Sequence, residues 1–198
     1  MKLLWAWFLS SLRTTLPLLF AAYGGLFSER AGVANIALES FLLWGGFSAS
    51  IVVSLTHSPL LGLTGAIGAS LLLGLFFSVF VLCLRANQLL IGLALNLLMG
   101  GFIPLLSNIL VGSTSSVKIM DVGWLNSSFF LSASLMMIAG TIFILKRTRF
   151  GLHAHAAGEN PQALTNQGLS VIRVRLAAIL IGSVLAGLGG VFLSLGAG

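Results

Sequence analysis

The sequence predicts an all-α protein, a polytopic transmembrane helical bundle of about six membrane segments, one of them short or broken. Hydrophobic residues make up 58% of the 198 residues, charged residues only 7%, and the mean hydropathy is +1.09. A soluble domain carries about 25% charged residues, so this composition indicates a membrane protein. The apolar runs are also continuous, whereas membrane-spanning strands alternate apolar and polar residues. Four stretches contain no Asp, Glu, Lys or Arg: 40–84, 86–117, 122–145 and 176–198.

The N-terminal segments are the least regular of the predicted elements. Residues 2–13 combine two tryptophans with polar ends, which is typical of a helix lying at the membrane interface. Residues 14–27 are slightly short for a full crossing, and the polar Ser28-Glu29-Arg30 follows them. The remaining spans are assigned by their length and lie at 37–55, 60–84, 88–111, 128–145 and 176–195. One long loop, 112–127, joins two of them.

The distribution of positive charge predicts which side of the membrane each loop faces. Cytoplasmic loops are enriched in Lys and Arg, and five of the ten such residues lie in 146–175, the basic segment. With this segment inside, the loop 112–127 and the N-terminus fall outside. Seven basic residues are then cytoplasmic, against Lys2, Arg13 and Lys118 outside.

The basic segment also contains the signals for one short helix. Asn160 is a good N-cap residue, and Pro161 suits the first helical position. Gln162–Gln167 can form two turns, Gly168 is a natural C-terminal stop, and Glu159 precedes the positive end of the helix. A rigid helix of this kind indicates a docking element for a soluble partner. An ordinary solvated loop with one helical turn is an equal alternative.

Small residues recur every four positions in two of the predicted spans. In lipid, this spacing allows helix backbones to approach closely. We therefore expect two packing faces, formed by Gly62, Ala66, Ser70, Gly74 and Ser78 and by Gly182, Ala186, Gly190 and Ser194.

A polar stripe follows one face of the span 88–111. Its members lie four residues apart, at Gln88, Gly92, Asn96, Gly100, Pro104 and Asn108. Asn96 and Asn108 are candidates for a translocation path, because polar groups in lipid often face a cavity. The alternative is a helix–helix contact with Asn96 bonded across it.

Glu39 is the only acidic residue inside a predicted apolar span, and Asn35 lies one turn before it. An intramembrane carboxylate is costly unless it faces a cavity or a partner, so both residues are candidate path residues. The alternative is an acid near the cytoplasmic end of its span that is tied to Arg30 or to backbone groups.

No cofactor, metal site or catalytic group is predicted. Cys83 is the single cysteine, and His153 and His155 have no third ligand nearby in the sequence. The chain has no G-x-x-x-x-G-K-[ST] motif for ATP and no nucleophile and base at matching depth, so we expect no enzyme. The basic residues are not interleaved with aromatic ones, and no nucleic-acid partner is expected.

Three segments of the sequence resemble the membrane permease subunits of bacterial ATP-binding-cassette (ABC) importers. They are LFSERAGVANIALES (26–40), LIGLALNLL (90–98) and TRFGLHAHAAGENPQALTNQGLSVIRVRLAAILIGSVLAGLGG (148–190). The resemblance runs from about residue 12 to the end of the chain and is closest to the simple-sugar and nucleoside branch, which is related to the ribose and branched-chain amino-acid permeases. It implies one multi-pass permease domain, 1–198, in the bacterial cytoplasmic (inner) membrane, divided into transmembrane spans (14–145), a cytoplasmic coupling loop (146–175) and a last span (176–195).

The resemblance also implies roles for particular residues. In such permeases the segment matching Gly158-Glu159-Asn160-Pro161, with the helix after it, couples the permease to a cytoplasmic ABC ATPase. The candidate coupling residues are therefore Gly158, Glu159, Asn160, Pro161, Gln162 and Gly168. The segment matching 29–40, which contains Asn35 and Glu39, is a broken region near the transport path. The other implied partners are a second permease subunit, forming a heterodimer, and an extracellular or periplasmic solute-binding lipoprotein, with a simple sugar, a nucleoside or a similar small polar molecule as solute.

Two departures from the family pattern are visible. His153 and His155 stand where such permeases commonly have arginines. The chain ends at Gly198, whereas family members continue through further spans, so we expect a bundle that is truncated relative to the family. Two alternative functions are an ion-coupled secondary transporter or channel, in which Glu39 supplies the intramembrane charge, and a non-transporting membrane scaffold.

Overall fold

The computed structural model describes residues 2–111 and 127–196, and every regular element in these two ranges is helical. This confirms the predicted all-α class. In chain order the elements are α1 (Lys2–Arg30), α2 (Leu38–Thr56), α3 (Pro59–Ser78), the π-helical η1 (Val79–Cys83), α4 (Gln88–Val111), α5 (Ser127–Arg147), α6 (Arg149–Glu159), α7 (Pro161–Asn166), α8 (Val171–Val191) and the π-helical η2 (Phe192–Gly196).

Four helical segments of the described chain are long and apolar enough to cross a bilayer. They are Leu38–Thr56, Pro59–Cys83, Gln88–Leu110 and Val171–Leu195. The other two of the six predicted spans correspond to α1 and α5, which contain 29 and 21 residues. At a rise of about 1.5 Å per residue, both are long enough for a crossing by length alone.

A single helix, α1, covers both N-terminal segments that the sequence analysis separates, 2–13 and 14–27. Pro17 lies inside this helix and is fully buried. Proline is tolerated within membrane helices because neighbouring groups can satisfy the backbone carbonyl that it leaves unpaired. Residues 2–13 are therefore not a separate helix, and an interfacial position for them stays a prediction.

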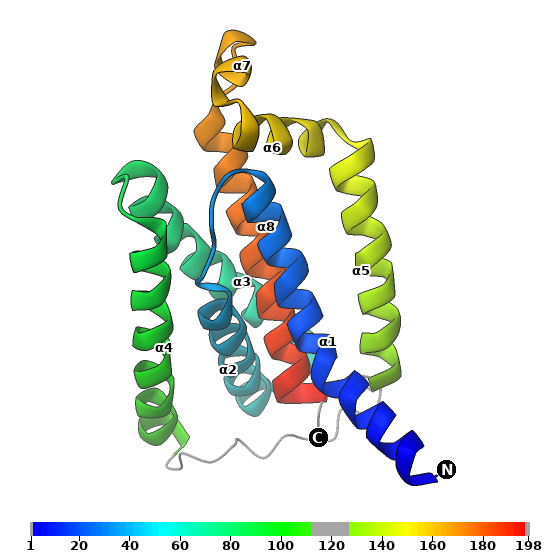
Figure 1. Cartoon of the computed structure of the whole chain (residues 1–198). Helices are drawn as coiled ribbons and strands as arrows, with labels where there is room; N and C mark the ends of the chain where they lie inside the picture. Colours follow the sequence, from blue (N-terminus) through cyan, green and yellow to red (C-terminus); the bar gives the residue numbers. More distant parts are fainter. Residues whose placement is uncertain (1, 112–126, 197–198) are drawn as a thin grey trace.

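Figure 1 shows which elements share an end of the bundle. The C-terminal end of α1, the turn between η1 and α4, and helices α6 and α7 lie at one end, whereas the N-terminus and the C-terminal end of α2 lie at the other. This is the alternation that the charge distribution predicts. We refer to the end that carries Arg30, Arg85 and the basic segment as the basic end. The positive-inside rule predicts that this end lies in the cytoplasm.

Helix α8 runs through the centre of the bundle and packs against α1, α2 and α3 (Figure 1). Glycines allow these backbones to meet: a Cβ atom on Gly182 of α8 would lie 2.6 Å from the carbonyl oxygen of Gly24 in α1. A Cβ atom on Gly74 of α3 would likewise collide with Ser183 of α8. Both predicted ladders of small residues therefore lie at helix contacts, which confirms them as packing faces.

Between α1 and α2 the chain is not helical over residues 31–37, the 31–37 linker. Figure 1 shows it running from the basic end into the bundle, so that α2 begins part-way along it. The fully buried rings of Phe41 in α2 and Phe77 in α3 meet edge to face, with centroids 6.1 Å apart. This contact holds the start of α2 against α3. The broken membrane segment predicted from the sequence is therefore present.

Candidate functional site

The basic end is built on a helix that the sequence analysis missed. Residues Arg149–Glu159 form α6, where we expected an irregular loop. Its N-cap is Thr148, whose Oγ1 accepts a hydrogen bond from the backbone N–H of Gly151 over 3.3 Å. Gly151, Ala154 and Ala157 are its buried residues. The sequence does carry this signal, since a capping threonine is followed by small residues at a spacing of three.

Helix α7 has the caps that the sequence predicts. The Asn160 Oδ1 accepts a hydrogen bond from the N–H of Ala163 over 3.2 Å, and Pro161 occupies the first helical position. After α7, Gly168 adopts a positive φ of 75°, and the N–H of Leu169 donates to the carbonyl of Leu164 over 3.1 Å. This is the hydrogen bond of a Schellman motif, which satisfies a carbonyl at the helix end.

Helix α7 projects from the basic end as a small exposed knob (Figure 1). Leu164 is its buried residue and fastens it to the bundle, whereas Gln162 and Gly168 are exposed. Glu159, just before α7, is also exposed and lies 3.5 Å from the Nδ1 of His155. An exposed pair of this kind contributes little to stability. These polar groups are therefore open to a partner.

Arg175 ties this knob to the membrane-embedded part of the chain. From the first turns of α8, its Nε donates to the carbonyl of Ala31 over 3.1 Å, and an amino group donates to the carbonyl of Ala157 over 3.0 Å. One guanidinium therefore joins the 31–37 linker to the last turn of α6. From the sequence, Arg175 is recognisable only as a positive charge, because nothing local indicates partners so far along the chain.

Two glycines bring the same segments into direct contact. Gly32 in the linker has a positive φ of 78°, which favours glycine. A Cβ atom on Gly158 would lie 2.5 Å from the carbonyl oxygen of Arg30, and one on Gly32 would lie 2.9 Å from the Cα of Gly158. Gly158, predicted to belong to the coupling element, therefore lies directly against the linker.

On its other side, the linker is bonded to the polar stripe of α4. The Gln88 Oε1 accepts a hydrogen bond from the N–H of Ala34 over 3.2 Å. The Asn96 side-chain amide donates to the carbonyl of Ile36 over 3.0 Å. Its oxygen accepts from the backbone N–H of Ser40, over 3.1 Å, and from the Ser40 hydroxyl. Asn96 thus caps the first turn of α2 from a neighbouring helix.

Asn96 and Asn35 both have hydrogen-bond partners within the chain, and their part in a translocation path remains a prediction. Asn35 is buried, with its Oδ1 accepting from the N–H of Ala37 over 3.2 Å and its amide donating to Ser28 Oγ over 3.4 Å. Of the two alternatives for the α4 stripe, the bonded helix contact describes Asn96. Asn108, three turns further along α4, is exposed.

Glu39 is exposed in the first turn of α2. Within the described ranges, its carboxylate has no hydrogen bond and no ion pair, so the alternative tie to Arg30 or to backbone groups is not formed there. Glu39 shares one face of α2 with Leu43 and Phe47, four and eight residues further on. The carboxylate therefore stands on the same face as the cavity that these two residues line.

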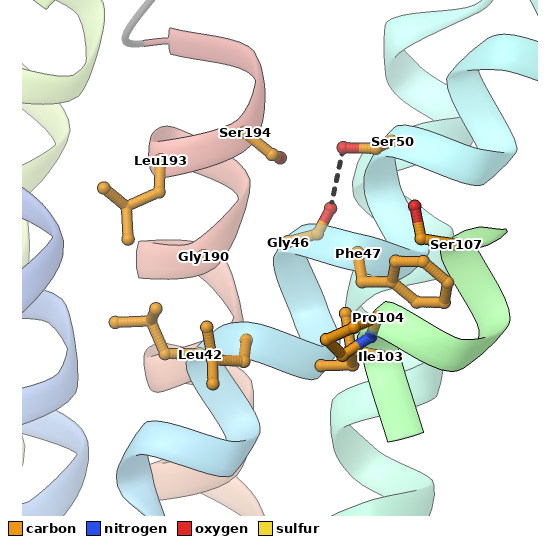
Figure 2. A pocket seen from close by; sticks show the side chains of 11 residues that line it. Leu42, Gly46, Phe47, Ser50, Ile103, Pro104, Ser107, Gly190, Leu193 and Ser194 are labelled. Carbon is orange, nitrogen blue, oxygen red and sulfur yellow. Dashed lines mark hydrogen bonds between the residues drawn. The ribbon is translucent and has the colours of Figure 1, made fainter. Parts of the chain in front are cut away.

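That cavity, of about 310 Å³, lies between α2, α4 and the end of α8 (Figure 2). Its walls are mostly apolar, and three hydroxyl groups, of Ser50, Ser107 and Ser194, lie around it. The Ser50 hydroxyl donates to the carbonyl of Gly46 over 3.0 Å. Sequence reasoning did not single out these serines for a path, and the predicted Asn108 does not line the cavity whereas its neighbour Ser107 does.

Metal binding has no structural support in this part of the molecule. Among residues 2–111 and 127–196, no group of three His, Cys, Asp or Glu side chains is placed to hold an ion. The described residues form a series of contacts from α6 through the 31–37 linker to α2 and α4, and a small cavity that three hydroxyl groups surround.

Comparison with known proteins gives one family match. Residues 7–198 match the family described as the permease component of branched-chain amino acid transport systems. A guanosine ABC transporter permease of Bacillus subtilis is 32% identical, and a nucleoside ABC transporter permease of Lactococcus lactis is 33% identical, each over 88% of this chain. An L-arabinose ABC transporter permease of Azospirillum brasilense is 27% identical over 85% of this chain and 51% of its own length. No solved structure matches the chain.

The chain spans about three fifths, 62%, of the length of the Bacillus and Lactococcus relatives. The matched part includes the linker, the α4 stripe, α6 and α7, which all lie within residues 7–198.

Proposed function

Because this chain belongs to the family of permease components of branched-chain amino acid transport systems, we propose that it forms part of the solute path of an ABC importer. In this proposal it is an integral protein of the bacterial cytoplasmic membrane and has no ATP site of its own. Its partners are a cytoplasmic ABC ATPase, a second permease subunit and an extracellular or periplasmic solute-binding lipoprotein.

The observation that carries this proposal is the continuous set of contacts from the knob to the cavity. Helix α7 follows α6 directly, and Arg175 joins the end of α6 to the 31–37 linker. Gln88 and Asn96 join the linker to α4, and Asn96 also caps α2. Helices α2 and α4 in turn form two walls of the cavity. A displacement of α7 can therefore be transmitted through these hydrogen bonds to the helices that form the cavity walls.

The mechanism follows from this route. The lipoprotein delivers the solute to the outer mouth of the path, and ATP binding closes the ATPase subunits beneath the membrane. Gly158, Glu159, Asn160, Pro161, Gln162 and Gly168 form the contact that the ATPase moves. Because α6 and the linker are tied at Arg175, this motion changes the position of the α2 start and switches the path between outward-open and inward-open states.

We propose a small polar solute rich in hydroxyl groups, a nucleoside or a simple sugar. Relatives named for guanosine, nucleosides and L-arabinose support this class. The Glu39 carboxylate accepts hydrogen bonds, and serine hydroxyls both donate and accept them. These groups suit a hydroxyl-bearing ligand, with Asn35, Asn96 and Asn108 shaping the path around them.

An ion-coupled secondary transporter is the second candidate, and the unpartnered Glu39 is the observation that favours it. The two candidates differ in their energy source. Uptake by an ABC importer persists after a protonophore collapses the ion gradients, provided that cellular ATP is maintained, whereas ion-coupled uptake stops.

The coupling role is tested by purification of the tagged chain with its ATPase, recognised by its G-x-x-x-x-G-K-[ST] motif. The double variant Glu159→Arg plus Pro161→Gly reverses the charge next to α7 and removes the proline that begins it. We expect this variant to lose most of the co-purified ATPase. Arg147→Gln is the control, because Arg147 is exposed at the same end but lies outside α7. Undiminished recovery with the double variant contradicts the coupling role.

A further inference from the structure

A second, larger cavity lies at the basic end, beside the N-terminal part of α6. It encloses about 570 Å³ between α1, α5 and the start of α6. Residues of two chemical kinds line it, the apolar Leu26, Ile142 and Leu145 and the polar Tyr23, Arg30 and Lys146. This volume lies in the usual range for a small-molecule site.

The two cationic lining residues, Arg30 and Lys146, lie at the membrane-surface end of the cavity. Arg30 is the last residue of α1, and Lys146 lies in the last turn of α5. Leu26 and Ile142 lie one turn earlier on their helices, on the side toward the middle of the membrane. The cavity is therefore cationic at the membrane surface and mostly apolar below it, where Tyr23 and Thr141 add one hydroxyl group each.

The positive charge at this cavity is not neutralised within the described residues. Neither Arg30 nor Lys146 has an ion pair there. The pair found joins His155, which also lines the cavity, to the exposed Glu159. Glu29, the acidic residue next to Arg30 in the sequence, does not line the cavity. The lining also includes Thr148 and Gly151 at the N-terminal end of α6, where the helix dipole adds positive potential.

We infer that this cavity binds an anionic phospholipid of the leaflet that surrounds the basic end. The phosphate lies between Arg30 and Lys146, and part of an acyl chain lies against Leu26, Ile142 and Leu145. Basic pockets between membrane helices at the cytoplasmic surface suit acidic lipid headgroups. The apolar lower half excludes a free phosphate as the preferred ligand, because such an ion leaves that half unfilled.

The lipid then acts as a spacer between α5 and α1, next to the elbow at which α5 turns into α6. It contacts the N-terminal part of α6, whereas Arg175 and the 31–37 linker contact the last turn of α6. The position of α6 therefore depends on the lipid composition of the membrane. This inference does not require the proposed transport function.

The test measures lipid binding by the full chain, purified in a mild detergent, with native mass spectrometry. Phosphatidylglycerol and phosphatidylcholine are supplied at equal concentration in mixed micelles. We expect one tightly held phosphatidylglycerol per chain. In the variant Arg30→Gln plus Lys146→Gln, a loss of about fivefold for each cation gives a loss of affinity of about 25-fold.

The matched control is Arg147→Gln plus Arg173→Gln, which removes two exposed charges from the same end but leaves the cavity intact. This control should retain the lipid. Ile142→Trp fills the apolar half at constant charge and should also lose the lipid, which keeps the test informative if the charge variant fails to fold. The charge-preserving Arg30→Lys should bind within about threefold of the unaltered chain.

Three results would overturn the inference. The first is equal affinity for the two lipids, and the second is an equal loss of affinity in the two double variants. The third comes from a photo-crosslinker placed at Leu26 in native membranes, if it yields protein adducts and no lipid adducts, since a protein segment then occupies the cavity.

Discussion

The tie made by Arg175 predicts a large and local effect of one substitution. Replacing Arg175 with methionine keeps most of the side-chain volume and removes both hydrogen bonds, to the carbonyls of Ala31 and Ala157. Both alanines are fully buried, so water does not readily replace the guanidinium at either carbonyl. A buried acceptor left unsatisfied costs about 1–3 kcal/mol. Because Arg175 itself is half-buried, we take the lower part of this range twice, about 2–4 kcal/mol in total.

This free energy corresponds to a population of the opened α6–linker contact that rises by about 30- to 700-fold. Amide hydrogen exchange measures the opening directly. The reporters are the N–H of Gly32, which donates to Glu29, and the N–H of Asn160, which donates to Ala156. Both should exchange faster in Arg175→Met, whereas amides in α3 should keep their protection because their contacts are unchanged.

Arg173→Met is the matched control, since Arg173 lies on the same helix two residues earlier and is exposed. It should leave both reporters unaffected. Arg175→Lys should fall between the two, because a lysine supplies a point charge and not the guanidinium fork. If Arg175→Met exchanges within about threefold of the Arg173→Met control at both reporters, the reasoning from hydrogen-bond loss is refuted.

Three further predictions concern the free energy of unfolding, measured by denaturant titration of the chain in detergent micelles. Asn96→Ala should lower this free energy by about 1–3 kcal/mol, because it leaves the carbonyl of Ile36 and the N–H of Ser40 unpaired. Asn108 is exposed, so Asn108→Ala should change it little. Equal losses in the two variants would contradict the capping role of Asn96. Gly190→Ala should lower the free energy of unfolding by at least about 1–3 kcal/mol, because the added Cβ would overlap the carbonyl of Leu42. Gly100 has open space beside it, so Gly100→Ala should be neutral or stabilise the chain by up to about 1 kcal/mol. A larger loss for Gly100→Ala than for Gly190→Ala would show that α8 does not pack as described. Ser70→Ala should be neutral or stabilising, because the Ser70 hydroxyl is buried without a hydrogen-bond partner; a loss above about 1 kcal/mol would mean that this hydroxyl has a partner after all.

Features that depend on neighbouring residues could be predicted from the sequence. Helix α7 is an example, because Asn160, Pro161 and Gly168 act within one or two turns of themselves. The ladders of small residues are another, since any helix in lipid that carries such a face must bury it. The break before α2 was expected from the resemblance of residues 26–40 to the permease family.

Features that depend on distant partners were not predictable in this way. The partners of Arg175 include a residue 144 positions away, and no local pattern encodes such a contact. Helix α6 was missed because the basic segment was interpreted as a loop carrying one short helix, although the buried positions of α6 recur every three residues. The polar stripe had two alternatives because a polar side chain in lipid needs a partner, whether protein or solute. Only the structure shows that Asn96 has a protein partner.

The way in which α4 is fastened has a consequence for the size of the solute cavity. The hydrogen bonds of Gln88 and Asn96 to the 31–37 linker and to α2 lie in the half of α4 nearest the basic end. Beyond them come Gly100 and Gly101, with open space beside both, and then Pro104, which removes a backbone hydrogen bond. Bending at these residues swings the far half of α4, with Ser107, toward or away from α2 while every one of those bonds stays intact. The width of the cavity between α2 and α4 can thus change without breaking the hydrogen bonds that hold α4 to the linker.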